Sequence, residues 1–508
     1  MKRLMLCSTL RVLSRAVDEL AHDGLVENVA FASYGPSNDD LIGPSCEHVD
    51  LAATVAAGLK GDFHGVDLSW LTVDLIEQLS WAEALIYPMM ERIDSLKSHT
   101  HLQRRLLYHY LLCFWSEFLE RKKLDVVLFA SAPHEVSDFV LYALCKHRKI
   151  LTILINYTRL PGACYLSTDL GPNGMIRSGQ PVNQELLATV RANLAGIRRD
   201  YASAIPGDSK DVYERALRLK RMKRLEYVRQ VLRVPGWAAR KAYSLARMML
   251  VDRTPEKLRN YAQVRINAST WAAIKAEYRA RTAGFVMPRR YVYFLLSFQP
   301  ESTTSPLGDR FVDQHLAIAM LSKNLPPEYE IVVKEHPVQM AEFNHYNYLG
   351  RDANFYERLS QLPRVRFAPV DADHFGLLDG ALLVASVNGS VGWESAVRRK
   401  PTIVFGDAWY QHAPGVFRIR TDADCAKAIA RMLQNEVQID DAMIDRYVDE
   451  FLSGCEYLCL SEEEARFAGI PFEFGRSVAI AKTAIAAVFD QNAPSLRAQA
   501  AFGAKNPI

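Results

Sequence analysis

The sequence predicts an α/β protein with two parallel-sheet domains joined by a helical segment. At 508 residues the chain is too long for one ordinary domain and suits two. In both halves short apolar runs alternate with stretches of helical spacing, which is the pattern of a parallel sheet. Polar loops follow these runs in both halves. Because ligands of open α/β sheets bind beyond the carboxyl ends of the strands, the sequence predicts two facing sets of binding loops.

The composition indicates a soluble globular protein, with 49% hydrophobic and 23% charged residues and a net charge of +3. Its eight cysteines form no CxxC pair and no second pair at zinc-ligand spacing. We therefore expect reduced thiols, no metal site and a cytoplasmic location. The first apolar run is interrupted by Ser8, Thr9 and Arg11, which is unlike a secretory signal. No apolar stretch approaches the ~20 residues of a membrane span.

The first domain, residues 1–168, is predicted to be Rossmann-like and to receive the acceptor. Its clearest strand covers residues 125–130 and opens into a polar loop. The other predicted elements are strands at 4–10, 29–34 and 150–156, helices at 13–22 and within 51–93, and a strongly amphipathic helix at 101–120. Alternation of these elements favours a parallel sheet.

Residues 169–287 form the predicted helical insertion. Turn signals at 171–174 and 178–181 precede a stretch that lacks strand patterns. Between Arg215 and Arg253 there are twelve Lys or Arg residues against two acids, a net charge of +10. A basic amphipathic helix of this kind either lies on an anionic membrane surface or presents a solvated basic face. No nucleic-acid motif accompanies the charge, so we expect no nucleic-acid partner.

Residues 288–435 form the second predicted Rossmann-like domain, which is followed by C-terminal helices within 436–508. We expect these last helices to pack partly back on the N-terminal domain. The predicted strands are 291–297, 329–334, 365–367, 381–385 and 402–405, and the predicted helical stretches are 313–321, 373–378, 391–399, 422–433, 442–452 and 477–489.

A small-residue turn at 386–390 is the most informative feature of this second domain. It joins a strand to a helix and is followed by a second strand at 402–405. Backbone N–H groups at such a turn, with the positive end of a helix dipole, converge on one point that suits a phosphate. His336 lies at the end of an earlier strand of the same domain. The sequence therefore predicts a phosphate site built from two strand ends.

Several motifs in order give this region a family resemblance. Lys334-Glu335-His336-Pro337 is followed by the run from Ser386 to Ala396, then by Lys400-Pro401, Phe405-Gly406 and Trp409-Tyr410. This series resembles the bacterial capsule polysaccharide biosynthesis family, which includes the Kdo transferases and is similar to GT-B sialyltransferases. The resemblance covers roughly residues 290–415. It implies a GT-B-like fold, with two Rossmann-like domains facing across a cleft. It also implies a nucleotide-sugar in the C-terminal domain.

The resemblance also implies roles for donor-side residues. Family members use CMP-activated acidic sugars, so His336 is expected to contact the donor phosphate. Ser390 and the neighbouring amides would complete the cradle, and Glu394 would face the nucleotide. The alternatives are a strand-end hydrogen bond for His336, helix capping for Ser390 and dipole stabilisation for Glu394. This chain has Asn388-Gly389 where the family usually has a Ser-Ser/Thr turn, which leaves the nucleotide open.

Further donor-side candidates come from neighbouring positions. Gln299, Glu301 and Ser302 follow a predicted strand, and Gly389 belongs to the turn. Lys334 alternates with apolar strand residues, which allows a solvent-facing side chain. Tyr410 and His412 follow the last strand, where either ring could stack on the base.

The catalytic carboxylate is expected in the N-terminal domain. Glycosyl transfer needs a base for the acceptor hydroxyl or a nucleophile for double displacement. Glu135 and Asp138 follow the 125–130 strand and are three residues apart, so both can face one side of a helix start. Glu135 is the preferred candidate, and helix capping is the alternative for both. His134 in the same loop could hold the acceptor. No DxD-type acid pair in the sequence argues for a metal ion.

Together these observations predict a cytoplasmic, metal-independent glycosyltransferase without a cofactor. The expected donor is a CMP-sugar carrying an acidic 2-keto sugar such as Kdo or a sialic-acid-like nonulosonate. The acceptor would be a growing surface polysaccharide or glycolipid, with the protein docked on the inner membrane through Arg215–Arg253. The alternatives are a nucleotide-sugar epimerase of the same architecture and a non-catalytic scaffold in capsule assembly.

Overall fold

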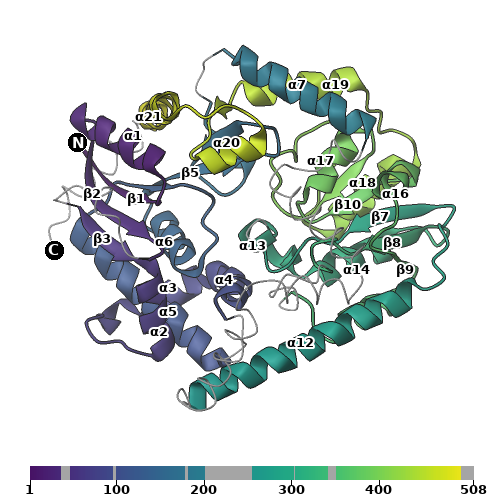
Figure 1. Ribbon diagram of the computed structural model, residues 1–508, viewed down its shortest axis with the longest axis horizontal. Coiled ribbons are helices and arrows are strands. Elements are labelled where there is room, and N and C mark those ends of the chain that lie inside the picture. The colour runs from purple at the N-terminus through teal and green to yellow at the C-terminus, as the bar shows by residue number, and fades with distance from the viewer. Residues whose placement is uncertain are drawn as a thin grey trace, which may run out of the picture.

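The computed structural model describes residues 1–35, 46–94, 99–177, 181–200, 255–301, 304–340 and 350–492. Within them the chain forms two α/β domains, each built on its own sheet (Figure 1). The predicted fold class is confirmed. The basic stretch Arg215–Arg253 and Ser302 lie outside the described residues.

The N-terminal sheet has the strand order β13-β6-β5-β4-β1-β2-β3 among the described residues. Its strands are β1 (Lys2–Cys7), β2 (Val26–Ser33), β3 (Glu47–Asp50), β4 (Val126–Phe129), β5 (Leu151–Tyr157), β6 (Ala163–Ser167) and β13 (Glu456–Tyr457). The first five are parallel, whereas β6 and β13 pair antiparallel. The prediction of a parallel sheet is therefore wrong at this edge. The loop between β5 and β6 is too short for a crossover, so the chain must return antiparallel.

Helices cover both faces of this sheet. They are α1 (Arg11–His22), α2 (Leu51–Lys60), α3 (Val73–Gln78), α4 (Ser80–Ile93), α5 (His101–Lys122) and α6 (Val136–His147), with a 3-10 turn η2 (Leu68–Trp70). The strongly amphipathic pattern expected for α5 is wrong, because buried residues occupy most of its circumference, including Tyr108, Trp115 and Phe118. This helix packs between α2 and α6, so it has little free surface.

The C-terminal sheet is parallel throughout, with the order β12-β11-β10-β7-β8-β9 among the described residues. Its strands are β7 (Tyr291–Leu295), β8 (Glu330–Lys334), β9 (Val365–Ala368), β10 (Val384–Ser386), β11 (Thr402–Val404) and β12 (Val416–Arg418). The surrounding helices are α13 (Thr304–Leu307), η4 (Asp309–Val312), α14 (Gln314–Asn324), α15 (Phe355–Ser360), α16 (His374–Gly380), α17 (Ser390–Val397) and α18 (Asp422–Leu433). All carboxyl ends therefore lie at one edge.

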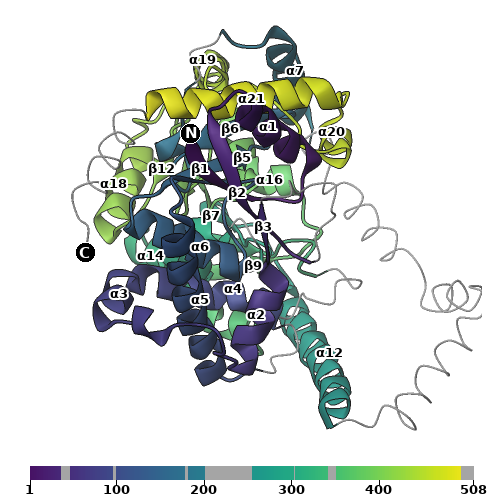
Figure 2. The same cartoon turned by 90° about the vertical axis from the view of Figure 1, so that its left-hand side faces the viewer.

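The remaining helices join the two domains. Helix α7 (Gln184–Arg199) packs on α17 and on α19 (Asp441–Leu452). Helix α12 (Pro255–Thr282) lies against β9 and α15 and runs along the lower edge of the molecule in Figure 1. After α20 (Glu462–Ala468), α21 (Phe474–Gln491) lies across α1, as Figure 2 also shows. The C-terminal residues thus contribute to the core of the N-terminal domain.

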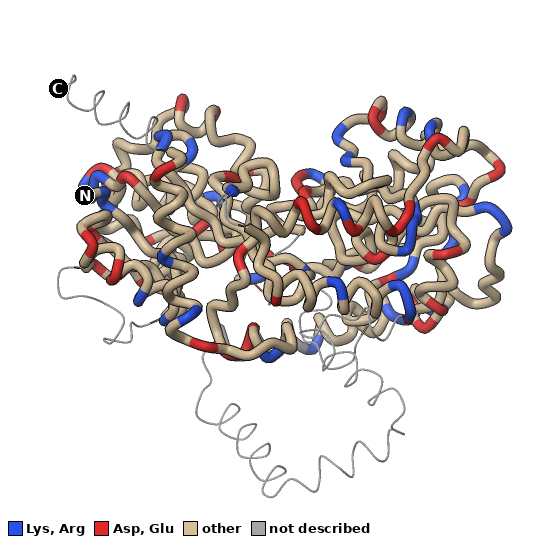
Figure 3. The backbone as a smooth tube through the Cα atoms, turned by 90° about the horizontal axis from the view of Figure 1, so that it is seen from above, with Lys and Arg blue, Asp and Glu red and all other residues tan. Residues whose placement is uncertain are grey.

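The surface of the described residues carries both signs of charge. Lys and Arg are interspersed with Asp and Glu along both halves in Figure 3. Within the part of the chain that the structure describes, no helix combines the length and apolarity needed to cross a membrane.

Candidate functional site

The carboxyl ends of β8, β9 and β10 bring several polar side chains to one edge. Lys334 ends β8 and is only 3% exposed. Its Nζ donates to the Ala372 carbonyl at 3.0 Å. Burial lowers its pKa to about 8, although Asp373, Asp371 and Glu394 oppose the shift. The solvent-facing side chain allowed by the strand pattern is therefore wrong, because this lysine points into the polar edge of the sheet.

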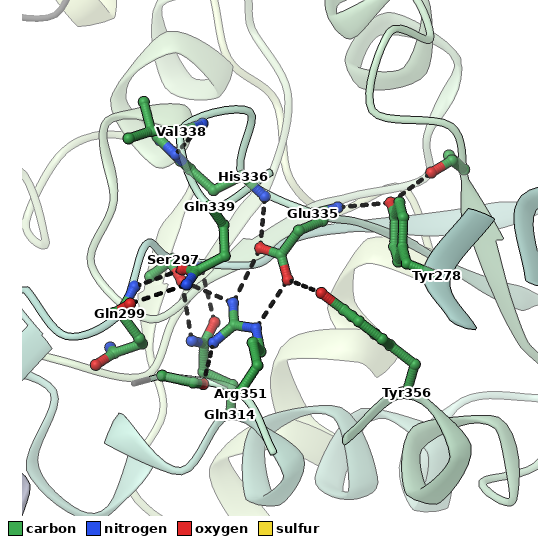
Figure 4. A network of polar contacts seen from close by, with 12 residues as sticks. Tyr278, Ser297, Gln299, Gln314, Glu335, His336, Val338, Gln339, Arg351 and Tyr356 are labelled. Atoms are coloured by element: carbon green, nitrogen blue, oxygen red, sulfur yellow. Dashed lines mark hydrogen bonds and ion pairs between the residues drawn. The ribbon is translucent and has the colours of Figure 1, made fainter. Parts of the chain in front are cut away.

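His336 follows β8 and has a defined tautomer. The Val338 N–H donates to its Nδ1 at 3.3 Å, so the ring proton is on Nε2 (Figure 4). Burial lowers the pKa of His336 to about 3, and Arg351, Lys334 and Arg159 add to the shift. The imidazole is therefore neutral at neutral pH, with an N–H donor in electropositive surroundings. Such surroundings suit an anion.

A buried ion pair fixes the chain next to this histidine. Glu335 and Arg351 are both buried, and Arg351 Nε and Nη2 donate to the two carboxylate oxygens at 2.8 and 2.9 Å. The Tyr356 hydroxyl donates to the same carboxylate at 2.7 Å. The backbone N–H of His336 donates to Glu335 Oε1 at 2.6 Å, so the ion pair directly orients the histidine backbone (Figure 4).

Two glutamines fix the neighbouring loop. Gln339 bonds the N–H and carbonyl of Gln299 at 2.8 and 2.9 Å. Gln314 bonds the N–H and carbonyl of Ser297 at 2.7 and 3.1 Å. The Gln299 side chain donates to the Thr304 hydroxyl within its own loop. These buried hydrogen bonds hold the loop after β7 rigidly beside His336.

Helix α17 begins at the glycine turn predicted to hold phosphate. Gly389 is its N-cap residue, and no side chain caps the helix among the described residues. The Gly389 N–H instead donates to Ser386 Oγ at 3.2 Å. A Cβ on Gly389 would lie 3.1 Å from that oxygen, so the turn leaves little room for a larger residue. The first N–H groups of α17 therefore remain available to an anion at the dipole's positive end.

Tyr410 is hydrogen-bonded to this turn. Its hydroxyl donates to the Gly389 carbonyl, and its ring is 1% exposed against Trp393 and Trp409. Base stacking by Tyr410 is therefore wrong, because neither ring face is available to a ligand. His412 lies further out and shares a polar contact with Asn173 at 3.3 Å.

Ser390 and Glu394 are bonded to each other in the first turns of α17. The Ser390 hydroxyl and Glu394 Oε1 are 3.0 Å apart. Because an ionised carboxylate only accepts, Ser390 is the donor. Glu394 Oε2 lies 3.0 Å from His374 Nε2, and Tyr293 Oη lies 3.0 Å from His374 Nδ1. Both Glu394 oxygens thus have a hydrogen-bond partner, rather than one being left unoccupied for a nucleotide.

A second polar cluster lies at the end of β4 in the N-terminal domain. The Glu135 side chain is 31% exposed, and His134 Nδ1 lies 2.7 Å from the Ala132 carbonyl. Asp138 is partly buried, with Oδ1 shielded from solvent, and desolvation with the nearby Glu135 charge raises its pKa well above the usual range. Tyr34 follows β2 and is 44% exposed. Desolvation of its hydroxyl and the nearby Asp138 and Glu135 charges raise its pKa, which places the hydroxyl in the same cluster.

Arg92 connects this cluster to the C-terminal domain. Its Nη1 donates to the Glu301 carbonyl at 3.3 Å, and α4 packs against α13 and η4. Arg92 also lies close enough to Glu135 and Asp138 to interact with their charges. The two predicted half-sites therefore meet through one arginine.

Sequence reasoning missed four residues of these clusters: Tyr34, Arg92, Arg159 and His374. Tyr34 directly follows strand β2, so a uniform search of all strand ends would have found it. Arg92 lies late in a helix, Arg159 in the β5–β6 loop and His374 at the start of α16, and only the tertiary fold brings these three here. In the described part of the chain, no cluster of three His, Cys, Asp or Glu side chains could hold a metal ion.

Comparison with known proteins confirms the family resemblance of the C-terminal half. Residues 305–450 match the family described as capsule polysaccharide biosynthesis protein. This match includes His336, His374, Ser390 and Glu394. No curated protein matches the sequence.

Among solved structures, the chain resembles KpsC from Thermosulfurimonas dismutans, a β-Kdo 2,7 transferase. The identity is 10%, the coverage 72% of this chain and 88% of that one, and the TM-score 0.27. The KpsC β-Kdo 2,4 transferase of the same organism is 16% identical, with coverage of 60% of this chain and 79% of that one and a TM-score of 0.24. A UDP-GlcNAc 2-epimerase from Methanocaldococcus jannaschii is 10% identical, with coverage of 88% of this chain and 98% of that one and a TM-score of 0.25. At these TM-scores none of the three supports a statement about this chain's activity.

Proposed function

We propose that this protein is a glycosyltransferase of surface-polysaccharide synthesis that uses a CMP-activated acidic sugar. One observation carries the proposal: Lys334, His336 and the uncapped start of α17 all lie at the carboxyl edge of one parallel sheet, and Glu394 of α17 is close enough to Lys334 to affect its titration. A neutral N–H donor, a buried ammonium and free helix amides are suited to a phosphate ester. The capsule biosynthesis family match over the same residues supports the polysaccharide context.

The proposed chemistry follows from charge development. When the glycosidic bond to the phosphate breaks, negative charge grows on the leaving phosphate of CMP. His336 Nε2–H, Lys334 and the first α17 amides are fixed donors that stabilise this charge without rearranging. Fixed donors and a cation of this kind can neutralise the leaving group without a metal ion.

Glu135 is the proposed base for the acceptor hydroxyl. Its side chain is 31% exposed, so a hydroxyl can reach it, whereas Asp138 Oδ1 is shielded from solvent. His134 stays neutral because burial lowers its pKa, and it can hold the acceptor as a hydrogen-bond partner. Arg92, close to both carboxylates, limits their repulsion.

The test is product analysis by mass spectrometry, with NMR spectroscopy to detect a product of unchanged mass and altered stereochemistry. The purified protein would be incubated with CMP-Kdo, a CMP-nonulosonate or UDP-GlcNAc, with and without a short polysaccharide acceptor. The proposal predicts CMP release and an acceptor heavier by one sugar residue. A sugar nucleotide of unchanged mass but altered stereochemistry would identify an epimerase. Absence of both nucleotide binding and product would favour a scaffold.

A further inference from the structure

A buried hydrogen-bonded chain leads from β7 to the start of α17. The Tyr293 hydroxyl lies 3.0 Å from His374 Nδ1, His374 Nε2 lies 3.0 Å from Glu394 Oε2, and Ser390 Oγ lies 3.0 Å from Glu394 Oε1. Tyr293, His374 and Glu394 are 0%, 5% and 6% exposed. None of these hydrogen bonds is needed to form the helices, so helix formation does not explain the series.

The direction of each bond can be worked out from the acceptors. An ionised Glu394 only accepts, so it accepts one hydrogen bond from Ser390 Oγ and one from His374 Nε2. The Tyr293 hydroxyl then donates to Nδ1 if the ring is neutral, or accepts from it if the ring is charged. In either case His374 Nε2–H donates to Glu394. The role of His374 toward Glu394 therefore holds in both protonation states.

Glu394 presents an electrostatic problem for an anion site. It lies one turn inside α17, near the helix start where the donor phosphate is proposed to bind. A carboxylate at that depth repels a phosphate unless its charge is engaged elsewhere. Ser390 engages Oε1 at the helix start, and His374 engages Oε2 on the interior side. His374 also lies close enough to His336 to affect its titration.

We infer that His374 is a positioning residue of the donor site, which holds Glu394 away from the phosphate of the bound nucleotide and thereby fixes Ser390. This inference rests on the proposed function. His374 itself does not touch the donor in this account. It acts through Glu394, and its contribution appears only with ligands that carry a phosphate.

A pair of substitutions separates positioning from packing. In His374→Gln the amide nitrogen can replace Nε2 as the donor to Glu394, whereas His374→Asn reproduces only the Nδ1 position and cannot reach it. Calorimetric titration with CMP should show about tenfold weaker binding, or more, for His374→Asn, because one hydrogen bond to a charged group is lost. His374→Gln should stay within about threefold of the wild type. Cytidine, which lacks the phosphate, should bind all three proteins equally.

A double-mutant cycle tests the route through Glu394. In a Glu394→Gln background the carboxylate charge is absent, so His374→Asn should weaken CMP binding by much less than it does in the wild type. His48→Gln is the matched control, because His48 also bonds a hydroxyl, that of Ser33 at 2.8 Å, but lies in the N-terminal domain. It should leave CMP binding unchanged. Thermal unfolding of each variant verifies that it is folded.

Different failures have different meanings. If wild-type protein binds CMP and both His374 variants match it, the positioning role is wrong while the proposed function stands. Equal losses in the Asn and Gln variants, or an equal loss with cytidine, would also overturn it, because packing alone would then explain the effect. If the wild type binds no CMP, the proposed donor is wrong and the inference fails with it.

Discussion

The two sheet ends of this molecule differ in how their buried charged groups are paired. At the C-terminal end, Glu335 is bonded on both oxygens, and the loop beside His336 is fixed by Gln314 and Gln339. At the N-terminal end, Arg92 Nε and Nη2 and Asp138 Oδ1 are buried without a hydrogen-bond partner among the described residues. Unpaired buried donors and acceptors cost free energy, whereas a closed network makes a site rigid.

This difference matches the two roles proposed for the sheet ends, donor binding and proton transfer. The C-terminal end is preorganised, which suits binding of a donor whose phosphate must meet fixed groups. The N-terminal end contains carboxylates that interact with one another and with a single arginine, which suits proton transfer.

Breaking the closed network should cause the largest loss of stability. Glu335→Gln leaves Arg351 buried without its counter-charge, so we expect the free energy of unfolding to fall by about 3–5 kcal/mol. The matched control is Glu330→Gln at the other end of β8, where the partner Arg366 is 64% exposed. That change should cost less than about 1 kcal/mol. Urea unfolding followed by tryptophan fluorescence measures both, and equal effects would contradict the rigid network.

Substitutions in the N-terminal cluster should separate activity from binding. Glu135→Gln removes the proposed base, so the transfer rate should fall by about 100-fold or more while CMP affinity stays unchanged. Asp138→Asn should retain most activity, because an amide resembles the protonated carboxyl that its raised pKa favours. A larger rate loss for Asp138→Asn than for Glu135→Gln would show that the two roles are exchanged.

The same Asp138 shift has a consequence for stability. Because the folded pKa is raised above the unfolded value, the unfavourable burial of the charged form appears as pH rises above the unfolded value. Asp138→Asn should therefore raise the melting temperature at neutral pH, and this gain should disappear as pH falls below about 4. Differential scanning calorimetry at the two pH values measures it.

Lys334 should make nucleotide binding depend on pH. Its pKa is lowered to about 8, and a bound phosphate raises it again by favouring the ammonium. Above pH 8 the free site has lost this proton and must take it up on binding, so CMP affinity should fall by up to about tenfold per pH unit. Lys334→Met should bind more weakly but with no such slope between pH 7 and 9. Identical slopes in both proteins would exclude Lys334 from the phosphate site.

Tyr410→Phe should have the smallest effect. It removes one hydrogen bond, from the hydroxyl to the Gly389 carbonyl, and leaves the ring in its buried position. We expect a loss of about 1 kcal/mol in stability and a CMP affinity within about threefold of the wild type. If Tyr410 stacked on the base, Tyr410→Phe would change neither the stability nor the CMP affinity. Tyr410→Ala would then abolish CMP binding without affecting stability.

The local pattern of the sequence explains what could be predicted. Strand, turn and helix follow one another around Gly389, and polar residues such as His336 end apolar runs, so the C-terminal edge was visible without a structure. The antiparallel edge was not, because β13 is two residues long and pairs with a strand about 290 positions earlier. Arg92 and His374 gain their places from tertiary contacts. The burial of Tyr410 depends on Trp393 and Trp409, which period and spacing do not reveal.

The central claim is that His336 and the start of α17 form a preformed site for the phosphate of a CMP-sugar. Calorimetric titration of wild-type protein and His336→Ala with CMP and with cytidine tests it most directly. The wild type should bind CMP more tightly than cytidine, and His336→Ala should lose about tenfold or more in CMP affinity while binding cytidine as before. Equal CMP affinity in the two proteins, or no preference of the wild type for CMP over cytidine, would contradict the claim.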